Sequence, residues 1–254
     1  MDTKLHFRAS DSDDAQDALK GLSDHYGQHS PEECDIIVPL GGDGFFLECL
    51  HELHHLNKAF YGVNKGSEGF LLNKSISDRL SERIPKSHAI KLHALNMTVK
   101  TSDGETHDAI AFNEVALFRQ TRQTAHVQII IDDKERINTL VADGIMVATP
   151  AGSTAYNLSA HGPIIPLNSP LLALTPISPY RPRRWKGALL PQESVITFNA
   201  LDPHKRPVSV SGDFTEIRDV VSVEVRKKNS VSVTVLFDPD EALEERIMRE
   251  QFTV

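Results

Sequence analysis

Four residues, Gly41-Gly42-Asp43-Gly44, place one carboxylate on a turn that otherwise carries no side chain. The turn follows the apolar run 36–40 and precedes a segment, 45–50, that is typical of a helix. Glycines let backbone N–H groups approach a ligand closely, and a helix N-terminus favours an anion such as phosphate. A carboxylate beside a phosphate repels it unless the carboxylate takes a proton or holds a metal. Asp43 is therefore a candidate reactive group at a phosphate-binding turn, although the same four residues also form ordinary tight turns.

A second polar group interrupts an apolar segment in the middle of the chain. Asn113 and Glu114 lie inside the run 109–118, where polar side chains are costly to bury unless something bonds them. An amide beside a carboxylate suits a nucleoside, because the amide can bond a base edge and the carboxylate can bond ribose hydroxyls. A strand end or a β-bulge would also explain the two residues.

The densest polar stretch of the second half is 149–156, Thr-Pro-Ala-Gly-Ser-Thr-Ala-Tyr, preceded by Asp143-Gly144. It predicts a strand, a glycine turn and a helix start, whose hydroxyl groups and N–H donors form a second candidate nucleotide site. Ser and Thr also cap helices routinely, so single hydroxyls have a simpler explanation. The basic segment 181–186 could contact phosphates, stack on a base, lie at a subunit interface or remain a solvated loop.

Other patterns point to chemistry that the rest of the sequence supports poorly. Residues 51–55, His-Glu-Leu-His-His, match the H-E-x-x-H zinc-peptidase motif, but the pattern places no third ligand. Residues 69–75 end in Lys-Ser without the preceding glycine of a Walker A motif, and no G-x-G-x-x-G of a Rossmann dehydrogenase occurs. Ser153 does not lie in a nucleophile elbow, so a serine hydrolase is disfavoured as well.

The amino-acid composition limits the classes of protein to which the chain can belong. The 254 residues contain 40% hydrophobic and 24% charged side chains, which suits a soluble protein of one or two domains. A net charge of −8 argues against broad nucleic-acid binding, and Cys34 and Cys49 cannot form a disulfide framework or a four-thiolate site. We expect no signal peptide and no membrane segment, with a reducing cytoplasm as the simplest location.

The elements that must position these residues change character near residue 88. Before it, strands at 5–7, 36–40 and 59–63 alternate with helices at 11–19, 45–56 and 77–84, the last ended by Pro85. This order predicts a parallel sheet that binds ligands at the carboxyl ends of its strands. After residue 88, the predicted strands are 92–100, 110–118, 125–131, 137–147, 194–199, 207–211, 220–226 and 230–237.

These later strands predict an antiparallel all-β domain that contains one helix, at 153–160. A charged helix with a narrow apolar stripe follows at 240–250. We therefore predict an α/β domain over residues 1–90, an all-β domain over 91–238, and a C-terminal helix within 239–254 that packs on the first domain.

Taken in order, these motifs resemble those of the NAD kinase family over nearly the whole chain. The motifs are 41–44, 62–66 (Gly-Val-Asn-Lys-Gly) with 69–71, Asn113-Glu114, and 143–144 with 149–156. Gly-Gly-Asp-Gly alone would also fit lipid kinases of the diacylglycerol and sphingosine type. The resemblance implies an α/β N-terminal domain with a parallel sheet of the NAD kinase/diacylglycerol kinase kind, an all-β C-terminal domain, and a terminal helix that returns to the first domain.

The resemblance also implies an activity: phosphoryl transfer from ATP or polyphosphate to the adenosine-ribose 2′-hydroxyl of NAD, giving NADP. By position, Asp43 is the general base, Asn113 and Glu114 hold the adenosine, and Asp143 contacts the nicotinamide half. Further implied NAD contacts are Gly44, Thr154, Ala155, Tyr156, Ser159, Ser178 and Asp213, and implied phosphate-binding turns contain Gly41, Gly42, Asn64 and Gly66. A divalent cation, Mg²⁺, is implied on the nucleotide phosphates, and the family forms homodimers or homotetramers with shared sites.

The sequence departs from the family pattern at three places. Phe45 stands where most members carry threonine, Glu68 replaces a usual leucine, and Pro179-Tyr180 replaces Pro-His. Phe45 removes a hydroxyl beside the donor phosphates, which leaves the phosphoryl donor open. Two alternatives also stay open: a kinase of the same fold for a lipid or another hydroxyl substrate, and a non-catalytic NAD(H)-binding sensor. Asn113-Glu114 disfavours the first, and Asp43 disfavours the second.

Overall fold

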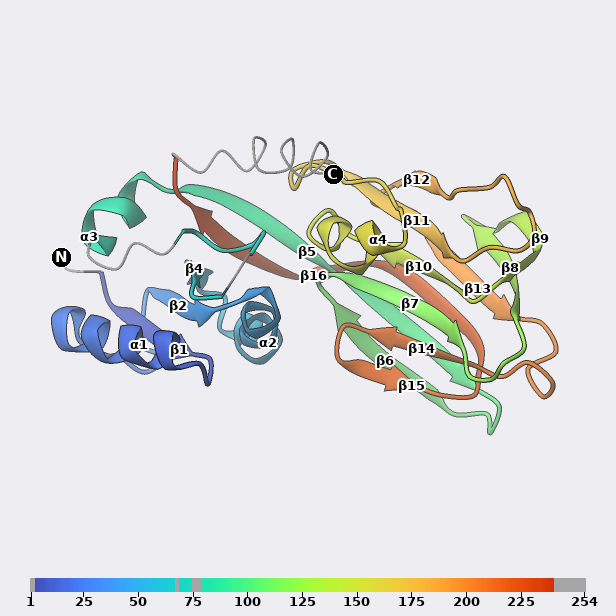
Figure 1. Cartoon of the computed structure of the whole chain (residues 1–254), viewed down its shortest axis with the longest axis horizontal. Coiled ribbons are helices and arrows are strands. Elements are labelled where there is room, and N and C mark those ends of the chain that lie inside the picture. Colours follow the sequence, from blue (N-terminus) through green and yellow to red (C-terminus); the bar gives the residue numbers. More distant parts are fainter. Residues whose placement is uncertain (1–2, 67–68, 75–78, 240–254) are drawn as a thin grey trace. The chain divides into compact units, whose positions relative to one another are not determined.

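The computed structural model describes residues 3–66, 69–74 and 79–239 (Figure 1). These residues form two compact units. The first contains the described residues up to Leu92 and those from Val231 onward, and the second runs from His93 to Ser230. The end of the last long strand is thus grouped with the first unit rather than with the all-β unit. The predicted C-terminal helix, from residue 240, and Glu68 lie outside the described residues.

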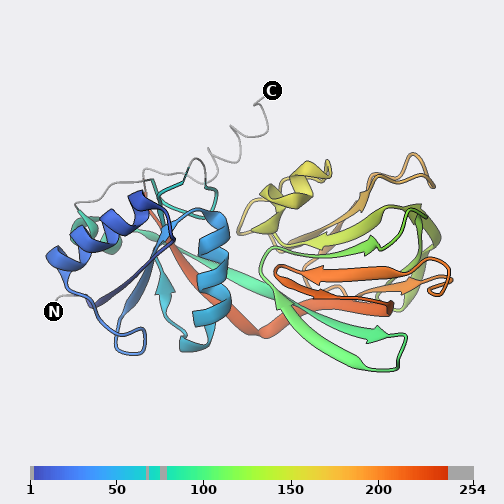
Figure 2. The ribbon, with the colours of Figure 1, turned by 60° about the horizontal axis from the view of Figure 1, so that its bottom comes forward.

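The first unit is built on a parallel sheet, as predicted. Its strands, in order across the sheet, are β1 (Leu5–Ala9), β2 (Ile36–Gly41), β3 (Ala59–Phe60) and the end of β16 (Val220–Phe237). The short strand β4 (Val63–Asn64) pairs with the end of β2. Helices α1 (Asp13–Tyr26) and α2 (Asp43–Leu53) lie on the same side of these strands (Figures 1 and 2). The predicted third strand, 59–63, is therefore split into two short strands.

The remaining elements of the first unit are short. A 3₁₀ turn, η1 (His54–Leu56), follows α2, and α3 (Leu80–Arg83) continues into a second one, η2 (Ile84–Lys86). The helix predicted over 77–84 is described only from Leu80 onward, and Pro85 lies within η2 rather than ending the helix. Helix α1 buries Ala15 and Leu22, two turns apart, in an apolar core that includes Phe7 and Val38.

The second unit contains two antiparallel sheets that share one apolar core, which confirms the predicted all-β class. One sheet contains β6 (Thr106–Ala111), β5 (His88–Thr101), β16, β13 (Ile196–Ala200), β8 (Ala125–Ile131) and β9 (Lys134–Ala142). The other contains β12 (Ala188–Pro191), β11 (Leu171–Ile177), β10 (Gly144–Ala148), β7 (Glu114–Arg119), β14 (Val208–Gly212) and β15 (Thr215–Ile217). Buried side chains from both sheets, such as Met97 and Ile129 from one and Leu117 and Val147 from the other, form the core.

Two strands that the sequence predicts as continuous are broken where the chain changes sheets. The predicted strand 110–118 ends as β6 at Ala111 and resumes as β7 at Glu114 in the other sheet. The predicted strand 137–147 ends as β9 at Ala142 and resumes as β10 at Gly144. The prediction was wrong because apolar periodicity continues on both sides of each break. Two predicted site residues, Asn113 and Asp143, lie in these breaks.

Three other differences concern element boundaries. The predicted strands 220–226 and 230–237 are one strand, β16, and the strands β11, β12 and β15 were not predicted. The predicted helix 153–160 consists of a 3₁₀ turn, η3 (Gly152–Thr154), and a one-turn helix, α4 (Tyr156–Ser159). They are separated at Ala155, whose backbone (φ −90°, ψ −129°) leaves the helical region.

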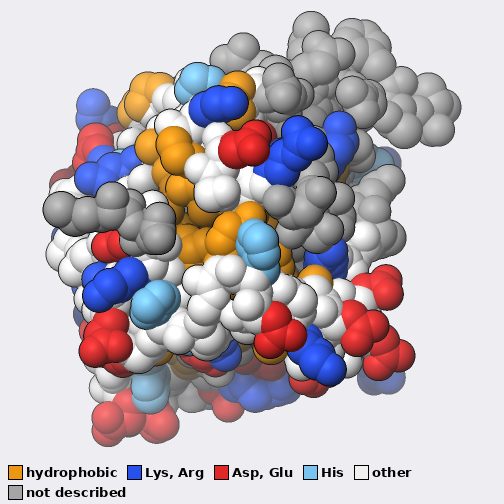
Figure 3. Space-filling model, turned by 90° about the vertical axis from the view of Figure 1, so that its left-hand side faces the viewer, with side chains coloured by type: hydrophobic (Ala, Val, Ile, Leu, Met, Phe, Trp, Pro, Cys, Tyr) orange, Lys and Arg blue, Asp and Glu red, His pale blue; other side chains and the backbone are white. Residues whose placement is uncertain are grey.

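The face of the first unit in Figure 3 carries charges of both signs around a central hydrophobic area. Neither the basic nor the acidic side chains form a continuous patch over the described part of this face. A pocket of about 410 Å³ lies in this unit and is lined partly by Leu5, Tyr26 and Ile84. Among the helices that the structure describes, none has the length and apolar character needed to cross a membrane.

Candidate functional site

The first group of candidate residues lies where β2 ends and α2 begins. Gly41 is the last residue of β2, Gly42 is the N-cap of α2, and Asp43 is the first residue of that helix. The Asp43 carboxylate accepts backbone N–H bonds from Phe70 (2.7 Å, at Oδ2) and Leu71 (3.0 Å, at Oδ1). Both carboxylate oxygens are thus held by backbone N–H groups of the segment 69–71, which fix the orientation of the candidate base.

The segment 62–66 also contacts the turn at 41–44 through its backbone. Asn64 pairs with Gly41 in the β2–β4 ladder, and the Lys65 N–H donates to the Gly41 carbonyl (2.9 Å). The Asn64 side-chain oxygen accepts the Gly66 N–H (2.9 Å), and a Cβ at Gly66 would lie 3.6 Å from the Gly42 Cα. Asn64 and Gly66 therefore lie next to Gly41 and Gly42, so the structure brings the predicted phosphate-binding residues of both motifs together.

Phe45 occupies the first turn of α2, where the resemblance expects threonine. Its ring packs on the glycine turn, because a Cβ at Gly41 would lie 2.9 Å from the Phe45 Cδ1. The Arg8 guanidinium lies 6.0 Å from the centroid of this ring and forms an ion pair with Glu52. The side chain at position 45 thus contributes an aromatic ring next to the turn instead of a hydroxyl.

The H-E-x-x-H segment is not arranged as a zinc site in the part of the chain that the structure describes. Glu52, the glutamate of the H-E-x-x-H motif, is paired with Arg8, and α2 ends at Leu53 before His54 and His55. The His54 Nδ1 lies 2.9 Å from the carbonyl of His51. Among the residues that the structure describes, no three His, Cys, Asp or Glu side chains are grouped to hold a metal ion. The zinc-peptidase interpretation is therefore unsupported.

The second group of candidate residues lies in the second unit, at the break between β6 and β7. The carboxylate of Asp213, from the β14–β15 turn, accepts backbone N–H bonds from Phe112 (2.6 Å), Asn113 (3.1 Å) and Glu114 (3.3 Å). Asp213 has a positive φ of 47°, a conformation that costs free energy for a residue other than glycine and is common at functional sites. Asp213 therefore shapes the backbone that presents Asn113 and Glu114.

Asn113 and Glu114 each carry a buried oxygen that no described residue bonds. These atoms are the Asn113 Oδ1 and the Glu114 Oε2. Burial, and then the charge of Asp213, raises the pKa of Glu114 to about 7. A buried polar atom without a partner costs about 1–3 kcal/mol, so hydrogen-bond donors of a ligand would be favourable at both oxygens.

The turn at 149–152 packs against the same break. The Thr149 N–H donates to the Asn113 carbonyl (2.9 Å), and the Thr149 hydroxyl donates to the Phe112 carbonyl (2.6 Å). A Cβ at Gly152 would lie 2.2 Å from the Asn113 carbonyl oxygen, so only glycine fits there. The hydroxyl of the next residue, Ser153, is fully buried and donates to the Pro150 carbonyl (2.7 Å), which removes it as a candidate nucleophile.

A pocket of about 530 Å³ in the second unit is lined by three predicted residues, Tyr156, Ser159 and Ser178. The Tyr156 ring stacks on Phe118, with 5.9 Å between ring centroids and 29° between planes. The pocket is also lined by His161, Arg183, Trp185 and Lys186. The structure thus places part of the basic segment 181–186 beside the predicted residues, which the sequence had left open.

Asp143 lies near this pocket and away from Glu114. It forms an ion pair with Arg119 (Nε to Oδ1, 2.5 Å), and its N–H donates to the carbonyl of Ile177, the neighbour of Ser178. Glu114 is paired with Ala148 at the other end of β10, so about 13 Å of strand separates Glu114 from the Asp143 end. Thr154 and Ala155 connect the two groups along the chain.

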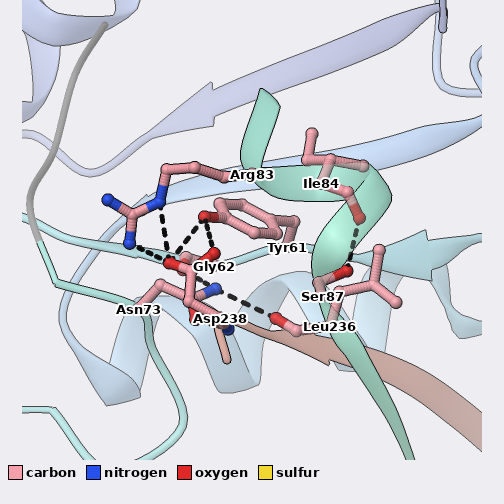
Figure 4. Close-up of polar contacts among 8 residues, drawn as sticks. All are labelled: Tyr61, Gly62, Asn73, Arg83, Ile84, Ser87, Leu236 and Asp238. Carbon is pink, nitrogen blue, oxygen red and sulfur yellow. Dashed lines mark hydrogen bonds and ion pairs between the residues drawn. The ribbon is translucent and has the colours of Figure 1, made fainter. Parts of the chain in front are cut away.

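Sequence reasoning missed several residues around these groups. Phe118 and His161 carried no signal, because an aromatic strand residue and a lone histidine are common in any β domain. A buried polar cluster in the first unit, consisting of Tyr61, Asn73, Arg83 and Asp238, was missed as well (Figure 4). The sequence carried no signal for this cluster, because only the structure shows that Asp238, the residue after β16, is buried.

The fold is that of nicotinamide-dinucleotide kinases whose structures are solved. A yeast NADH kinase complexed with NADH superposes with a TM-score of 0.83 at 20% identity, over 98% of this chain and 86% of that one. An NAD kinase from Archaeoglobus fulgidus in complex with ATP gives a TM-score of 0.77 at 22% identity, over 97% and 98% of the two chains. At such identities the likeness establishes the fold.

The sequence establishes the family. Residues 112–234 match the family model of the ATP-NAD kinase C-terminal domain. The NAD kinase of Mesorhizobium japonicum is 52% identical over 248 residues, which cover 98% of this chain and 96% of the relative. The NAD kinase of Caulobacter vibrioides is 51% identical over 251 residues, with 99% and 96% covered. The chain therefore belongs to the NAD kinase family of enzymes.

Proposed function

We propose that this enzyme transfers the γ-phosphoryl group of ATP to the 2′-hydroxyl of the adenosine ribose of NAD, giving NADP and ADP. The observation that carries the proposal is the pair of buried acceptors, Asn113 Oδ1 and Glu114 Oε2, to which no described residue donates. Ribose hydroxyls and an adenine amino group supply the donors that these atoms lack. The relatives named NAD kinase, about half identical over nearly the full chain, support the same substrate.

Asp43 is the general base in this proposal. The ribose oxygen forms a bond to the γ-phosphorus while the bond from that phosphorus to the β,γ-bridging oxygen breaks, and ADP leaves. The hydroxyl proton passes to the Asp43 carboxylate, which the N–H groups of Phe70 and Leu71 hold in one orientation. Phosphoryl transfer depends mainly on positioning and charge stabilisation, which suits a carboxylate held in one orientation.

NAD binding is assigned to the two groups of the second unit and, in the first unit, to Asp43 and Gly44. Asn113 and Glu114 hold the adenosine, and Asp213 contributes by fixing their backbone. The nicotinamide half is assigned to Asp143, with Thr154, Ala155, Tyr156, Ser159 and Ser178 as further contacts. Binding of NADH to the yeast kinase supports a dinucleotide ligand for this fold.

ATP is the proposed phosphoryl donor, and Mg²⁺ accompanies it. The turns that contain Gly41, Gly42, Asn64 and Gly66, together with the N-terminus of α2, suit the donor phosphates. Mg²⁺ is usually bound through one or two carboxylates and the phosphates of its nucleotide, so we assign it to the phosphate oxygens of ATP. The cation supplies neutralisation of the phosphate charge. The ATP complex of the archaeal NAD kinase supports ATP as a ligand of this fold.

We also propose a homodimer or homotetramer in the cytoplasm. Support for self-association is the exposure of large apolar side chains in the second unit, at Tyr180, Leu189 and Phe214. Support for the location is the pair of buried free thiols, Cys34 and Cys49, which suits a reducing compartment.

The decisive experiment incubates the purified protein with ATP, Mg²⁺ and NAD and detects NADP with an NADP-specific dehydrogenase. Parallel reactions replace ATP by polyphosphate, NAD by NADH, and NAD by diacylglycerol or sphingosine. NADP formation with ATP is the expected result. Well-folded protein that forms no NADP, or that phosphorylates only the lipids, would contradict the proposal.

A further inference from the structure

A buried polar cluster in the first unit lies at the end of β16 (Figure 4). The Asp238 carboxylate, in a residue that is 3% exposed, accepts the Tyr61 hydroxyl (2.8 and 2.9 Å to its two oxygens). It also accepts the Arg83 Nε–H (3.0 Å) and pairs with the Arg83 guanidinium, which compensates its charge. Burial, and then the bond to Asp238, raises the pKa of Tyr61, so its hydroxyl stays protonated as the donor.

Asn73 connects this cluster to β4 and uses all of its polar groups. Its side-chain amide donates to the carbonyls of Gly62 (3.1 Å) and Leu236 (2.9 Å), and its Oδ1 accepts the Asp238 N–H (2.9 Å). Its backbone N–H donates to the Gly62 carbonyl (2.8 Å), and its carbonyl accepts the Asn64 N–H (2.8 Å). Asn73 is 1% exposed, so water does not replace these bonds.

The chain from Asn73 leads directly to the groups that hold Asp43. Leu71 and Phe70, two and three residues earlier, donate their N–H groups to the Asp43 carboxylate. The intervening Leu72 is fully buried, and a Cβ at Gly62 would lie 2.4 Å from its Cδ2, so this segment is closely packed. A displacement at Asn73 therefore reaches the Asp43 carboxylate through two peptide units and two hydrogen bonds.

We propose that Asn73 is a positioning residue for Asp43, fixed in place by the Asp238–Tyr61–Arg83 cluster. The inference rests on the proposed role of Asp43 as general base. Asn73 does not touch substrate in this proposal; it sets the position of the Phe70 and Leu71 N–H groups, and through them the direction of the carboxylate. Replacing Asn73 should then lower turnover more than it weakens substrate binding, because Asn113 and Glu114, which are proposed to hold the adenosine, belong to the second unit.

The test compares Asn73→Ser with a matched substitution, Asn96→Ser, in the second unit. Asn96 is also buried (4% exposed), and it donates to Thr98 Oγ1 (3.1 Å) and accepts from Lys228 Nζ (2.9 Å), both residues of the second unit. We expect kcat of Asn73→Ser to fall about 10- to 100-fold, with KM for NAD changed by less than about threefold. Asn96→Ser should keep kcat. Equal effects of both substitutions on kcat would overturn the inference.

A gentler pair covers the case in which Asn73→Ser does not fold. Tyr61→Phe removes one hydroxyl from Asp238 and leaves the Arg83 pair, whereas Tyr26→Phe removes the hydroxyl that accepts the Leu80 N–H (3.1 Å). Both are single hydroxyl deletions in the first unit. We expect Tyr61→Phe to lower kcat at least about threefold and Tyr26→Phe to leave it unchanged. An unchanged kcat in Tyr61→Phe would overturn the role of the cluster.

A double-mutant cycle separates positioning from general loss of structure. If Asn73 acts through Asp43, then Asn73→Ser should lower kcat by less than about twofold in an Asp43→Asn background, as measured by single-turnover rates. Suppose that Asp43→Asn lowers kcat, and that adding Asn73→Ser lowers it again by as much as Asn73→Ser does in the wild type. That result would overturn this inference and leave the proposed function standing. Wild-type kcat in Asp43→Asn would overturn both this inference and the proposed function.

Discussion

Glu114 and Asp213 bond each other's backbone, and their carboxylates lie close enough to interact. The Glu114 N–H donates to the Asp213 carboxylate, and the Asp213 N–H donates to the Glu114 carbonyl, each over 3.3 Å. The Asp213 carboxylate is satisfied by three backbone N–H groups, whereas the Glu114 Oε2 is buried and receives no bond from the described residues. The two acidic groups thus differ sharply in environment, and Glu114 is the one that favours its protonated form.

The Glu114 carboxyl group should make stability depend on pH. Burial, and then the Asp213 charge, raises its pKa from about 4.5 to about 7 in the folded state. The folded protein then binds more protons than the unfolded chain between these values, so the contribution of Glu114 to stability falls as pH rises from 4.5 through 7. Relative to Glu114→Gln, the wild type should lose at most about 3 kcal/mol of unfolding free energy over this range.

Denaturant unfolding of both proteins at several pH values from 5 to 8 measures this difference. The same carboxylate, if it bonds the ribose of NAD, should make the wild-type affinity for NAD increase as pH rises through about 7, while the affinity of Glu114→Gln stays flat. If the difference in unfolding free energy between the wild type and Glu114→Gln does not change with pH, the pKa of Glu114 is not raised in the folded protein.

Asp43→Asn should separate binding from turnover. The asparagine keeps the shape of the side chain but cannot accept the hydroxyl proton, so kcat should fall about 10²- to 10⁴-fold while Kd for NAD stays within about threefold. Its amide would also face one of the two N–H groups of Phe70 and Leu71, which costs about 1–3 kcal/mol of stability.

The matched control for this substitution is Asp24→Asn, an exposed position on α1. NADP formation and calorimetric NAD binding should both stay at the wild-type level in this variant. A kcat of Asp43→Asn within a fewfold of wild type would contradict the role of Asp43 as general base.

The sequence predicted the fold where local pattern and tertiary structure agree. The apolar run 36–40 followed by glycines is β2 and the start of α2, since a buried parallel strand and a helix N-terminus each have local signatures. The change of sheet at Asn113 and Asp143 has none, because both flanking strands alternate in the same way. Continuity of β16 was hidden by Lys227 and Lys228, which extend the strand with partners at Glu193 and Asn96.

The candidate site could be predicted only where a residue conflicts with its surroundings. Asp43 on a bare turn and Glu114 in an apolar run are such conflicts. Asn73 and Asp238 are not, because their interaction joins residues 165 positions apart and each alone looks like an ordinary loop residue. Pairings of this kind depend on the assembled sheet, so no spacing in the chain reports them.

Metal removal should stop turnover without unfolding the protein. The described residues contain no grouped metal ligands, and Glu52 of the zinc-like motif is paired with Arg8, so EDTA should leave the melting temperature unchanged. NADP formation should disappear with EDTA and return with Mg²⁺, because the cation accompanies the nucleotide phosphates. Two results would contradict this prediction and support a metal ion bound by protein side chains. One is one zinc per chain in metal analysis of untagged protein, and the other is a large drop in melting temperature with EDTA.

Gly152→Ala tests whether the turn at 149–152 defines the NAD site. The new Cβ would lie 2.2 Å from the Asn113 carbonyl oxygen, so the turn must move away from Asn113, at a cost of about 1–3 kcal/mol of stability. Kd for NAD should rise about tenfold or more, because Asn113 and its neighbour then lose their fixed position. Gly21→Ala is the control: a Cβ there meets no atom within 4 Å, and replacing a glycine inside α1 should stabilise the protein by about 0.5–1 kcal/mol. Wild-type stability and NAD affinity in Gly152→Ala would mean that the turn moves without displacing Asn113, which would contradict the role of this turn in defining the NAD site.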